Sequence, residues 1–294
     1  MFNLSYKQQK TAIVIGFLLV PLALLAAFGV YPALELIRLS FASWNGFTAD
    51  LKWVGLDNYR EVLQSPELFK IFGHNAVYLL WGLMQNAAGL MFAIVLGSRL
   101  RGRNAYRVIL FLPYILNGTA VAFMFKYMYQ TEIGSLNALL SAISFRDVSI
   151  SWLGNPAIVN HALGFVGLWK FMGFNMVVYL AALQSIPTDM TEAARIDGAS
   201  RLQMLRHITL PSIVRIIELN LFLTIIGALE AFELPFLLTG GGPLGASETF
   251  VTHTVATAFK FSHFGLASAM SVILIVLVVL VLSLQRMIMR RWDE

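Results

Sequence analysis

The sequence predicts an all-α membrane protein with six transmembrane helices, and three observations carry that prediction. Of the 294 residues, 58% are hydrophobic and only 13% are charged, whereas an ordinary soluble domain has roughly 25% charged residues. The mean hydropathy is +0.72, and a chain with so few polar groups cannot cover a water-exposed surface. The third observation is a set of long apolar segments spread along the chain.

Six apolar runs are long enough to cross a bilayer, since a span needs about 20 predominantly apolar residues. They cover residues 11–36, 75–98, 108–129, 161–183, 213–238 and 264–287. The spans must be helices, because lipid offers the backbone no hydrogen-bond partners and no segment alternates apolar and polar residues as barrel strands do. The first run could also be a signal peptide, but it is longer than such an apolar region and five spans follow it.

The connections between the spans predict the orientation. Thirteen of the 21 Lys and Arg residues fall at the two termini and in the second and fourth connections. They are Lys7, Lys10, Arg99, Arg101, Arg103, Arg107, Arg195, Arg201, Arg206, Arg215, Arg286, Arg290 and Arg291. Positive residues favour the cytoplasmic side, so both termini of this multi-pass protein are expected in the cytoplasm. The net charge of +5 is then explained by topology and does not indicate nucleic acid as a partner.

Several kinds of site are not expected. The chain has no cysteine, which excludes disulfides and thiolate metal ligands, and its five histidines include no His-x3-His pair that could bind a metal from one helix face. No Ser/His or paired Asp arrangement indicates an intramembrane enzyme. No G-x4-G-K-[ST] loop is present to bind ATP phosphates, so we predict no enzyme activity and no cofactor in this chain.

The fourth connection, residues 184–212, predicts helix, glycine turn and helix. Asp197 and Gly198 would break the first helix, and Ser200 with Gln203 would form a capping box that starts the second. A compact element of this kind suits either a connector lying on the membrane or a contact for a cytoplasmic partner.

This connection also carries a family resemblance. Glu192, Ala193, Ala194, Gly198, Ile208, Leu210 and Pro211 match the E-A-A-x3-G-x9-I-x-L-P signature, the EAA motif, of permease subunits of bacterial ABC importers. The resemblance implies the type I ABC importer permease fold, in which this element, together with Asp197, forms coupling helices that dock into an ATPase subunit.

Further matches resemble the carbohydrate branch of that family, the permeases similar to those for maltose and glycerol 3-phosphate. They include residues 53–59 (WVGLDNY), 134–137 (GSLN) and 238–243 (LTGGGP). The first and the last of these segments look like the first of the two permease subunits of such importers. The resemblance implies a second permease, two ATP-binding subunits that hold ATP and Mg²⁺, an external solute-binding protein and a sugar as cargo. It also implies that the chain lies in the bacterial cytoplasmic (inner) membrane. It also suggests an outer gate at Gly240, Gly241, Gly242 and Pro243.

Polar side chains within the spans are candidates for the substrate pathway, because they are costly in lipid. Asn220, Thr224, Gly227, Glu230 and Glu233 follow each other at helical spacing on the fifth span. The other candidates are Trp81, Gln85, Asn86, Trp169, Lys170, Asn175 and Tyr179. Aromatic faces with amides and carboxylates suit a sugar.

Each candidate also has a purely structural interpretation. Lys170 is typical of an interhelical ion pair with Glu230 or Glu233, the tryptophans suit packing, and Asn86 and Asn175 suit hydrogen bonds between helices. The alternatives for function are the same machinery with glycerol phosphodiesters or another polar nutrient as cargo, and an ion channel or secondary transporter that uses Lys170, Glu230 and Glu233.

The expected organisation is a single membrane protein in three parts. Residues 1–70 form the first transmembrane helix and an outer loop, 71–287 the permease domain with coupling element 184–212, and 288–294 a cytoplasmic tail.

Overall fold

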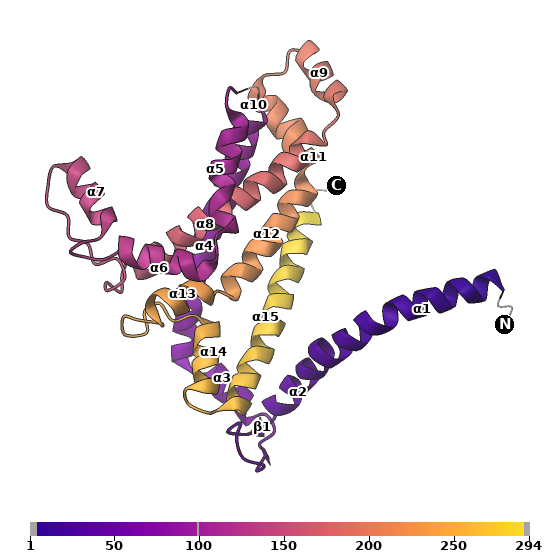
Figure 1. Ribbon diagram of the computed structural model, residues 1–294, viewed down its shortest axis with the longest axis vertical. Helices are drawn as coiled ribbons and strands as arrows, with labels where there is room; N and C mark the ends of the chain where they lie inside the picture. The colour runs from indigo at the N-terminus through magenta and orange to yellow at the C-terminus, as the bar shows by residue number, and fades with distance from the viewer. Residues whose placement is uncertain (1–4, 99, 291–294) are drawn as a thin grey trace. The chain divides into compact units, whose positions relative to one another are not determined.

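The computed structural model describes residues 5–98 and 100–290, and its elements are marked in Figure 1. Arg99 and Arg291, and the tail from residue 291 on, lie outside the described residues. Two compact units are present. The first takes the described residues up to Ser65 together with Thr254–Ile275, and the second takes Pro66–His253 and the described residues from Val276 on.

The first unit begins with one long apolar helical run. Its elements are α1 (Tyr6–Leu25), the π-helix η1 (Ala26–Val30), α2 (Tyr31–Ser40), β1 (Ala42–Ser43), β2 (Lys52–Trp53) and α3 (Asp57–Gln64), with parts of α14 (Phe250–Phe259) and α15 (Phe264–Arg290). The strands pair antiparallel, Ala42 with Trp53 and Ser43 with Lys52. The Phe264 amide donates to the carbonyl oxygen of Trp44 at 3.0 Å. This hydrogen bond fixes the start of α15 beside the small sheet.

The second unit is a helical bundle around α4 and α8. Its elements are α4 (Pro66–Gly97), α5 (Arg103–Ile115), α6 (Gly118–Met128), α7 (Ser135–Ser144), α8 (Val159–Gln184), α9 (Thr188–Ile196), α10 (Arg201–Met204), the π-helix η2 (Leu205–Thr209), α11 (Leu210–Ser212), α12 (Val214–Leu229) and α13 (Glu233–Thr239). Helix α8 packs along α4 and against α5. At Gly173 a β-carbon would overlap the Leu110 backbone, so only glycine allows α5 to approach α8 this closely.

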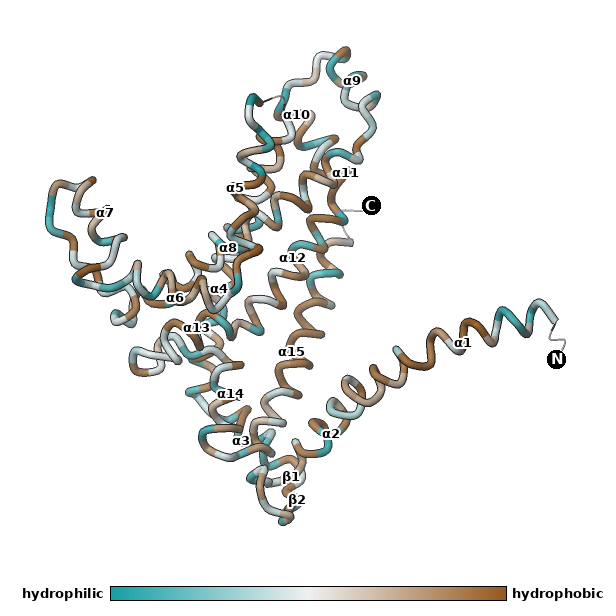
Figure 2. The backbone as a smooth tube through the Cα atoms, viewed as in Figure 1, coloured by the Kyte–Doolittle hydropathy of each residue, from teal (hydrophilic) through white to brown (hydrophobic). Residues whose placement is uncertain are grey.

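The prediction of a helical membrane protein is confirmed. Among the described residues, five helical stretches are long and apolar enough to span a membrane: Gln9–Ser40, Pro66–Gly97, Val159–Gln184, Val214–Thr239 and Phe264–Met289. Figure 2 shows hydrophobic residues along most of α1 and α15. The bent pair α5 and α6 covers the predicted third span, residues 108–129, and brings the possible spans among the described residues to six if the pair counts as one.

The predicted third span, residues 108–129, is not one continuous helix. Helices α5 and α6 meet at 97°, because Leu116 and Asn117 are extended, with ψ of 140° and 134°. The Asn117 side chain accepts the backbone N–H groups of Thr119 and Ala120 at 2.9 and 3.4 Å. Asn117 is therefore an N-cap that starts a new helix inside the apolar run.

The fifth span is also interrupted, between α12 and α13, so its polar residues do not share one continuous helix face as predicted. Pro235 explains the break. Proline has no N–H to donate to the carbonyl of Ala231 four residues earlier, and it is tolerated in the first turn of a helix. Thr249 supplies the missing donor, since its hydroxyl lies 2.6 Å from the Ala231 oxygen.

Candidate functional site

A cavity of about 520 Å³ lies in the second unit, bounded by α4, α5, α8, α12, α13 and the break between α12 and α13. Of the residues proposed for the pathway, Trp81, Gln85, Asn175, Thr224, Gly227, Glu230 and Glu233 line it. Aromatic side chains that sequence reasoning missed also line it, namely Tyr78, Tyr114, Phe171, Phe174 and Phe232. The wall is therefore aromatic, with a few amide, hydroxyl and carboxylate groups.

Other proposed pathway residues lie behind the wall in a hydrogen-bond network. Tyr179, 1% exposed, donates its hydroxyl to Asn86 Oδ1 at 2.8 Å. The Asn86 amide donates to the Thr224 hydroxyl, and that hydroxyl donates to the Asn220 carbonyl at 2.8 Å. Asn86, Tyr179 and Thr224 therefore link α4, α8 and α12. The Asn220 side chain instead donates to the Ile216 carbonyl at 3.1 Å, within α12. Trp169 packs edge-on against Phe125, with ring centroids 5.3 Å apart.

Asn175 combines burial with an unused donor. Its side chain is 4% exposed, and Nδ2 has no hydrogen-bond partner among the described residues. Because an unpaired buried donor is costly, this amide on the cavity wall is a candidate for a ligand contact.

The two cavity carboxylates have different electrostatic surroundings. Glu233 Oε2 lies 3.5 Å from the Nζ of Lys170, which is 8% exposed. Glu233 also lies against Gly118 at the start of α6, where a β-carbon would overlap its carboxylate, and a helix N-terminus favours negative charge. Glu230 is exposed and pairs with no basic group among the described residues. The cavity wall of this chain therefore carries one unneutralised carboxylate.

The predicted helix, glycine turn and helix of the fourth connection is confirmed. Gly198 has φ of +80°, a conformation that glycine adopts without strain, and its amide donates to the Arg195 carbonyl at 3.1 Å. Ser200 and Gln203 form the predicted capping box, with distances of 2.8 and 3.3 Å.

The signature residues lie on this element, and its surface is partly apolar. Glu192, Ala193, Asp197 and Gly198 are exposed, as is Pro211, while Ala194, Ile208 and Leu210 are half-buried. Ile196 and Leu202 are 86% and 74% exposed. Such apolar side chains beside charged ones suit a protein partner.

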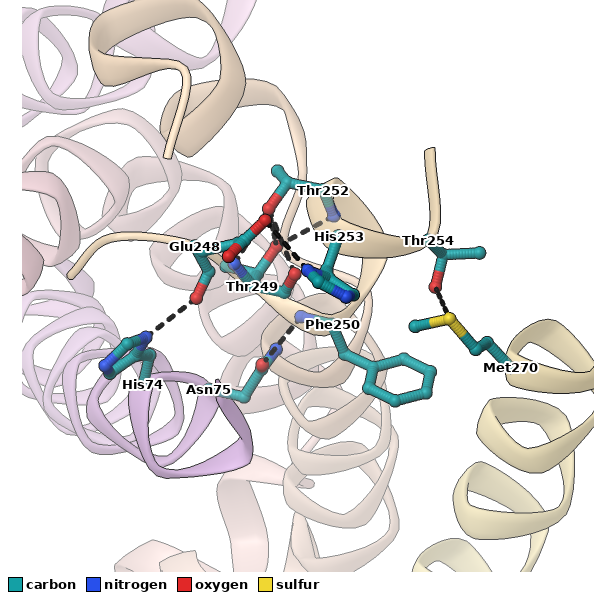
Figure 3. A network of polar contacts seen from close by, with 9 residues as sticks. All are labelled: His74, Asn75, Glu248, Thr249, Phe250, Thr252, His253, Thr254 and Met270. Carbon is teal, nitrogen blue, oxygen red and sulfur yellow. Dashed lines mark hydrogen bonds and ion pairs between the residues drawn. The ribbon is translucent and has the colours of Figure 1, made fainter. Parts of the chain in front are cut away.

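The glycine-rich loop after α13 is held by hydrogen bonds from other elements (Figure 3). Gly240 and Gly241 have φ of +60° and +90°. The peptide between Gly242 and Pro243 is cis, and the Ser247 hydroxyl donates to the Gly242 carbonyl. His74 Nδ1 donates to the Glu248 carbonyl at 2.8 Å. The loop is thus ordered by its own polar contacts and by α4.

The side chains that hold this loop were missed by sequence reasoning. His74 and Tyr78 on α4 and Asn160 on α8 contact partners 174, 82 and 86 residues away in the chain. No local sequence pattern predicts such distant pairs. A polar residue in or beside an apolar run does indicate that its side chain has a partner or a function.

Comparison with known proteins gives the family. Residues 85–294 match the model of the binding-protein-dependent transport system inner membrane component family. The chain is 33% identical over 272 residues to the probable ABC transporter permease protein YurN of Bacillus subtilis, covering 92% of this chain and 93% of YurN. It is 30% identical over 278 residues to the multiple sugar-binding transport system permease protein MsmF of Streptococcus mutans, covering 94% and 95%.

The fold has a solved counterpart. A chain in the crystal structure of a bacterial ABC transporter involved in the import of the acidic polysaccharide alginate superimposes with a TM-score of 0.84 at 23% identity, covering 97% of this chain and 98% of that chain. The predicted type I ABC importer permease fold is thus confirmed. From the family match and the relatives, the chain belongs to the binding-protein-dependent transport system inner membrane components, the multi-pass permeases of ABC importers.

Proposed function

We propose that this chain is one of two permease subunits of an ATP-driven importer for a saccharide without negative charge. The observation that carries the proposal is the cavity of about 520 Å³ with Trp81 and Tyr78 on its wall beside Gln85 and Glu230. Aromatic rings pack against the C–H faces of a sugar, while amides and carboxylates bind its hydroxyls. Relatives whose names include sugar transport, such as MsmF, support this cargo class.

The charge of the cavity separates the candidate cargoes. Glu230 is unneutralised while Lys170 is engaged by Glu233, so a phosphodiester or uronate entering this side of the cavity meets a like charge. Like charges a few ångströms apart repel each other even at a partly exposed site. The alternative cargo, glycerol phosphodiesters, is therefore disfavoured. Membership of the ABC permease family removes the support for an ion channel or secondary transporter.

ATP hydrolysis is assigned to partner subunits. The exposed element from α9 to α10, with Glu192, Ala193, Ala194, Asp197 and Gly198 and the following Ile208, Leu210 and Pro211, is proposed as the surface that docks on one of two ATP-binding subunits, which hold ATP and Mg²⁺. The basic residues of the termini and of the second and fourth connections support a cytoplasmic position for this element and both termini.

The remaining partners and parts follow from the same proposal. A second homologous permease completes the pathway, an external solute-binding protein delivers the sugar, and Gly240 to Pro243 belong to the outer gate. The division into residues 1–70, the permease domain 71–287 and a tail 288–294 stays a prediction.

Uptake by cells that express the whole importer tests the proposal. We expect ATP-dependent accumulation of a labelled neutral disaccharide, with competition by unlabelled neutral disaccharides and none by glycerophosphodiesters or uronate disaccharides. Trp81→Ala should reduce uptake strongly and Trp81→Phe much less, since phenylalanine keeps an aromatic face. Accumulation of a phosphodiester in preference to every neutral sugar would overturn the proposal.

A further inference from the structure

Tyr78 on α4 belongs both to the cavity and to a chain of contacts that leaves it. Its side chain lines the cavity, and its hydroxyl donates to Asn160 Oδ1 at 3.0 Å. Asn160 is 8% exposed, and its Nδ2 donates to the Ala246 carbonyl at 2.7 Å. Two hydrogen bonds therefore connect the cavity wall to the loop of residues 240–249 that follows α13.

The same face of α4 holds the end of this loop. His74, Tyr78, Trp81 and Gln85 follow each other at spacings of four, three and four, which places them on one side of the helix. At one end of this row, His74 donates to the Glu248 carbonyl at 2.8 Å. At the other end, Trp81 and Gln85 line the cavity.

Asn75 ties together the two ends of the segment that carries the loop. Its Nδ2 donates to the carbonyls of Ala228 and Leu229 at 2.8 and 3.2 Å, where α12 ends. Its Oδ1 accepts the Phe250 amide at 3.3 Å, where α14 begins (Figure 3). Both ends of the segment of residues 230–249 are therefore bound to the same turn of α4. Within the segment, Asn160 binds the Ala246 carbonyl and His74 binds the Glu248 carbonyl.

We propose that Tyr78 is a positioning residue of the outer gate, and that the contacts from Tyr78 through Asn160 to Ala246 couple occupancy of the cavity to release of loop 240–249. The phenol has one proton, which it gives to Asn160. A saccharide hydroxyl oxygen that accepts this proton competes with Asn160 and weakens the hold of Asn160 on the loop. That a bound saccharide releases the loop rests on the proposed function. The hydrogen bonds that connect Tyr78 through Asn160 to the loop do not depend on it.

The test uses a reporter on the loop. The chain has no native cysteine, and Leu244 at the loop tip is fully exposed, so Leu244→Cys gives this chain a single site for a spin label, in an importer whose partner subunits carry no reactive cysteine. We expect Tyr78→Phe and Asn160→Leu each to increase label mobility without any sugar, and the double variant to add nothing further. Tyr114→Phe is the matched control, because Tyr114 lines the same cavity and its hydroxyl makes no hydrogen bond to the loop among the described contacts.

Function gives the second measurement. ATP hydrolysis in the resting complex should rise about two- to tenfold in Tyr78→Phe and Asn160→Leu, the range that one lost hydrogen bond produces, and a mixture of maltose, trehalose and cellobiose should no longer mobilise the label. A structural role alone would lower the yield of complex and leave the mobility of the remaining complex unchanged.

The outcomes separate the two proposals. Unchanged label mobility in Tyr78→Phe, or the same increase in Tyr114→Phe, overturns the coupling whatever the cargo. If Tyr78→Phe increases label mobility but the wild-type importer takes up none of the neutral sugars, the contact of Tyr78 with the loop is supported and the proposed cargo is overturned. If Asn160→Leu does not assemble, the comparison of Tyr78→Phe with Tyr114→Phe decides alone.

Discussion

The ammonium group of Lys170 lies 3.5 Å from the carboxylate of Glu233, not from that of Glu230. The sequence left both pairings open, because the two glutamates are three residues apart. The break between α12 and α13 separates them, so that Glu233 begins α13 and reaches Lys170 on α8 while Glu230 ends α12 on the cavity wall. One glutamate therefore neutralises a buried lysine, and the other lies on the cavity wall without a basic partner among the described residues.

Removing Glu233 should destabilise the importer through Lys170. Glu233→Gln leaves the lysine buried and unpaired, which we expect to cost about 2–3 kcal/mol, less than the roughly 3–5 kcal/mol of a fully buried pair because Glu233 is half-exposed. Complex yield and melting temperature in detergent measure the loss. The double variant Glu233→Gln with Lys170→Met should recover most of it, whereas additive losses would contradict the pairing.

Glu230→Gln should leave assembly unchanged and alter selectivity. The amide has nearly the same shape as the carboxylate, so only the charge is lost from the cavity wall. We expect an anionic disaccharide to bind about tenfold more tightly than in the wild type, as removal of one like-charge contact worth about 1.4 kcal/mol would give. It should then inhibit uptake at concentrations that leave the wild type uninhibited. Uptake competition with neutral and anionic disaccharides measures this. An unchanged pattern would place Glu230 away from the cargo.

Gly198→Val should uncouple ATP hydrolysis from uptake. A β-branched residue at φ of +80° strains the turn by about 1–3 kcal/mol, which changes the angle between α9 and α10. Gly198→Asn is the control, because asparagine tolerates left-handed backbone angles. The ratio of sugar imported to ATP hydrolysed should fall in the valine variant and stay near the wild-type value in the asparagine variant. Equal ratios in both would show that the turn geometry does not matter.

His253 should give the importer a pH-dependent stability. The hydrogen bond from His253 Nδ1 to Glu248, at 3.0 Å, raises the pKa of His253 above its ordinary value; burial opposes this, and the charges of Glu248 and Glu67 add to it. A group whose pKa is raised by folding stabilises the folded state fully below its unfolded pKa of about 6.5 and loses that contribution as pH rises through the folded pKa.

Melting curves of wild type and His253→Gln from pH 5 to 9 check the sign. The difference in melting temperature should be largest at the acid end and should shrink as pH rises above about 6.5. Glu248→Gln should show the same profile. A difference that grows with pH would contradict the ion pair.

The helical architecture could be predicted because apolar run length and capping chemistry are local. Ser200 with Gln203 shows this, since both halves of the capping box lie within one turn. The two helix breaks also have local causes, the N-cap residue Asn117 and the proline Pro235 just after the break between α12 and α13. Both residues lie inside apolar runs, where hydropathy alone predicts one continuous helix. The links between Tyr78, Asn160 and Ala246 depend on how α4, α8 and the loop pack, and no spacing in the sequence reports that.

The most direct test of the proposed function is uptake of a labelled neutral disaccharide into proteoliposomes that contain this chain with the proposed second permease and ATP-binding subunits, with the proposed external binding protein added. We expect accumulation that requires both ATP and the binding protein and that falls sharply when Trp81 is replaced by alanine. Accumulation that continues without ATP, or that Trp81→Ala leaves unchanged while the complex assembles normally, would contradict it.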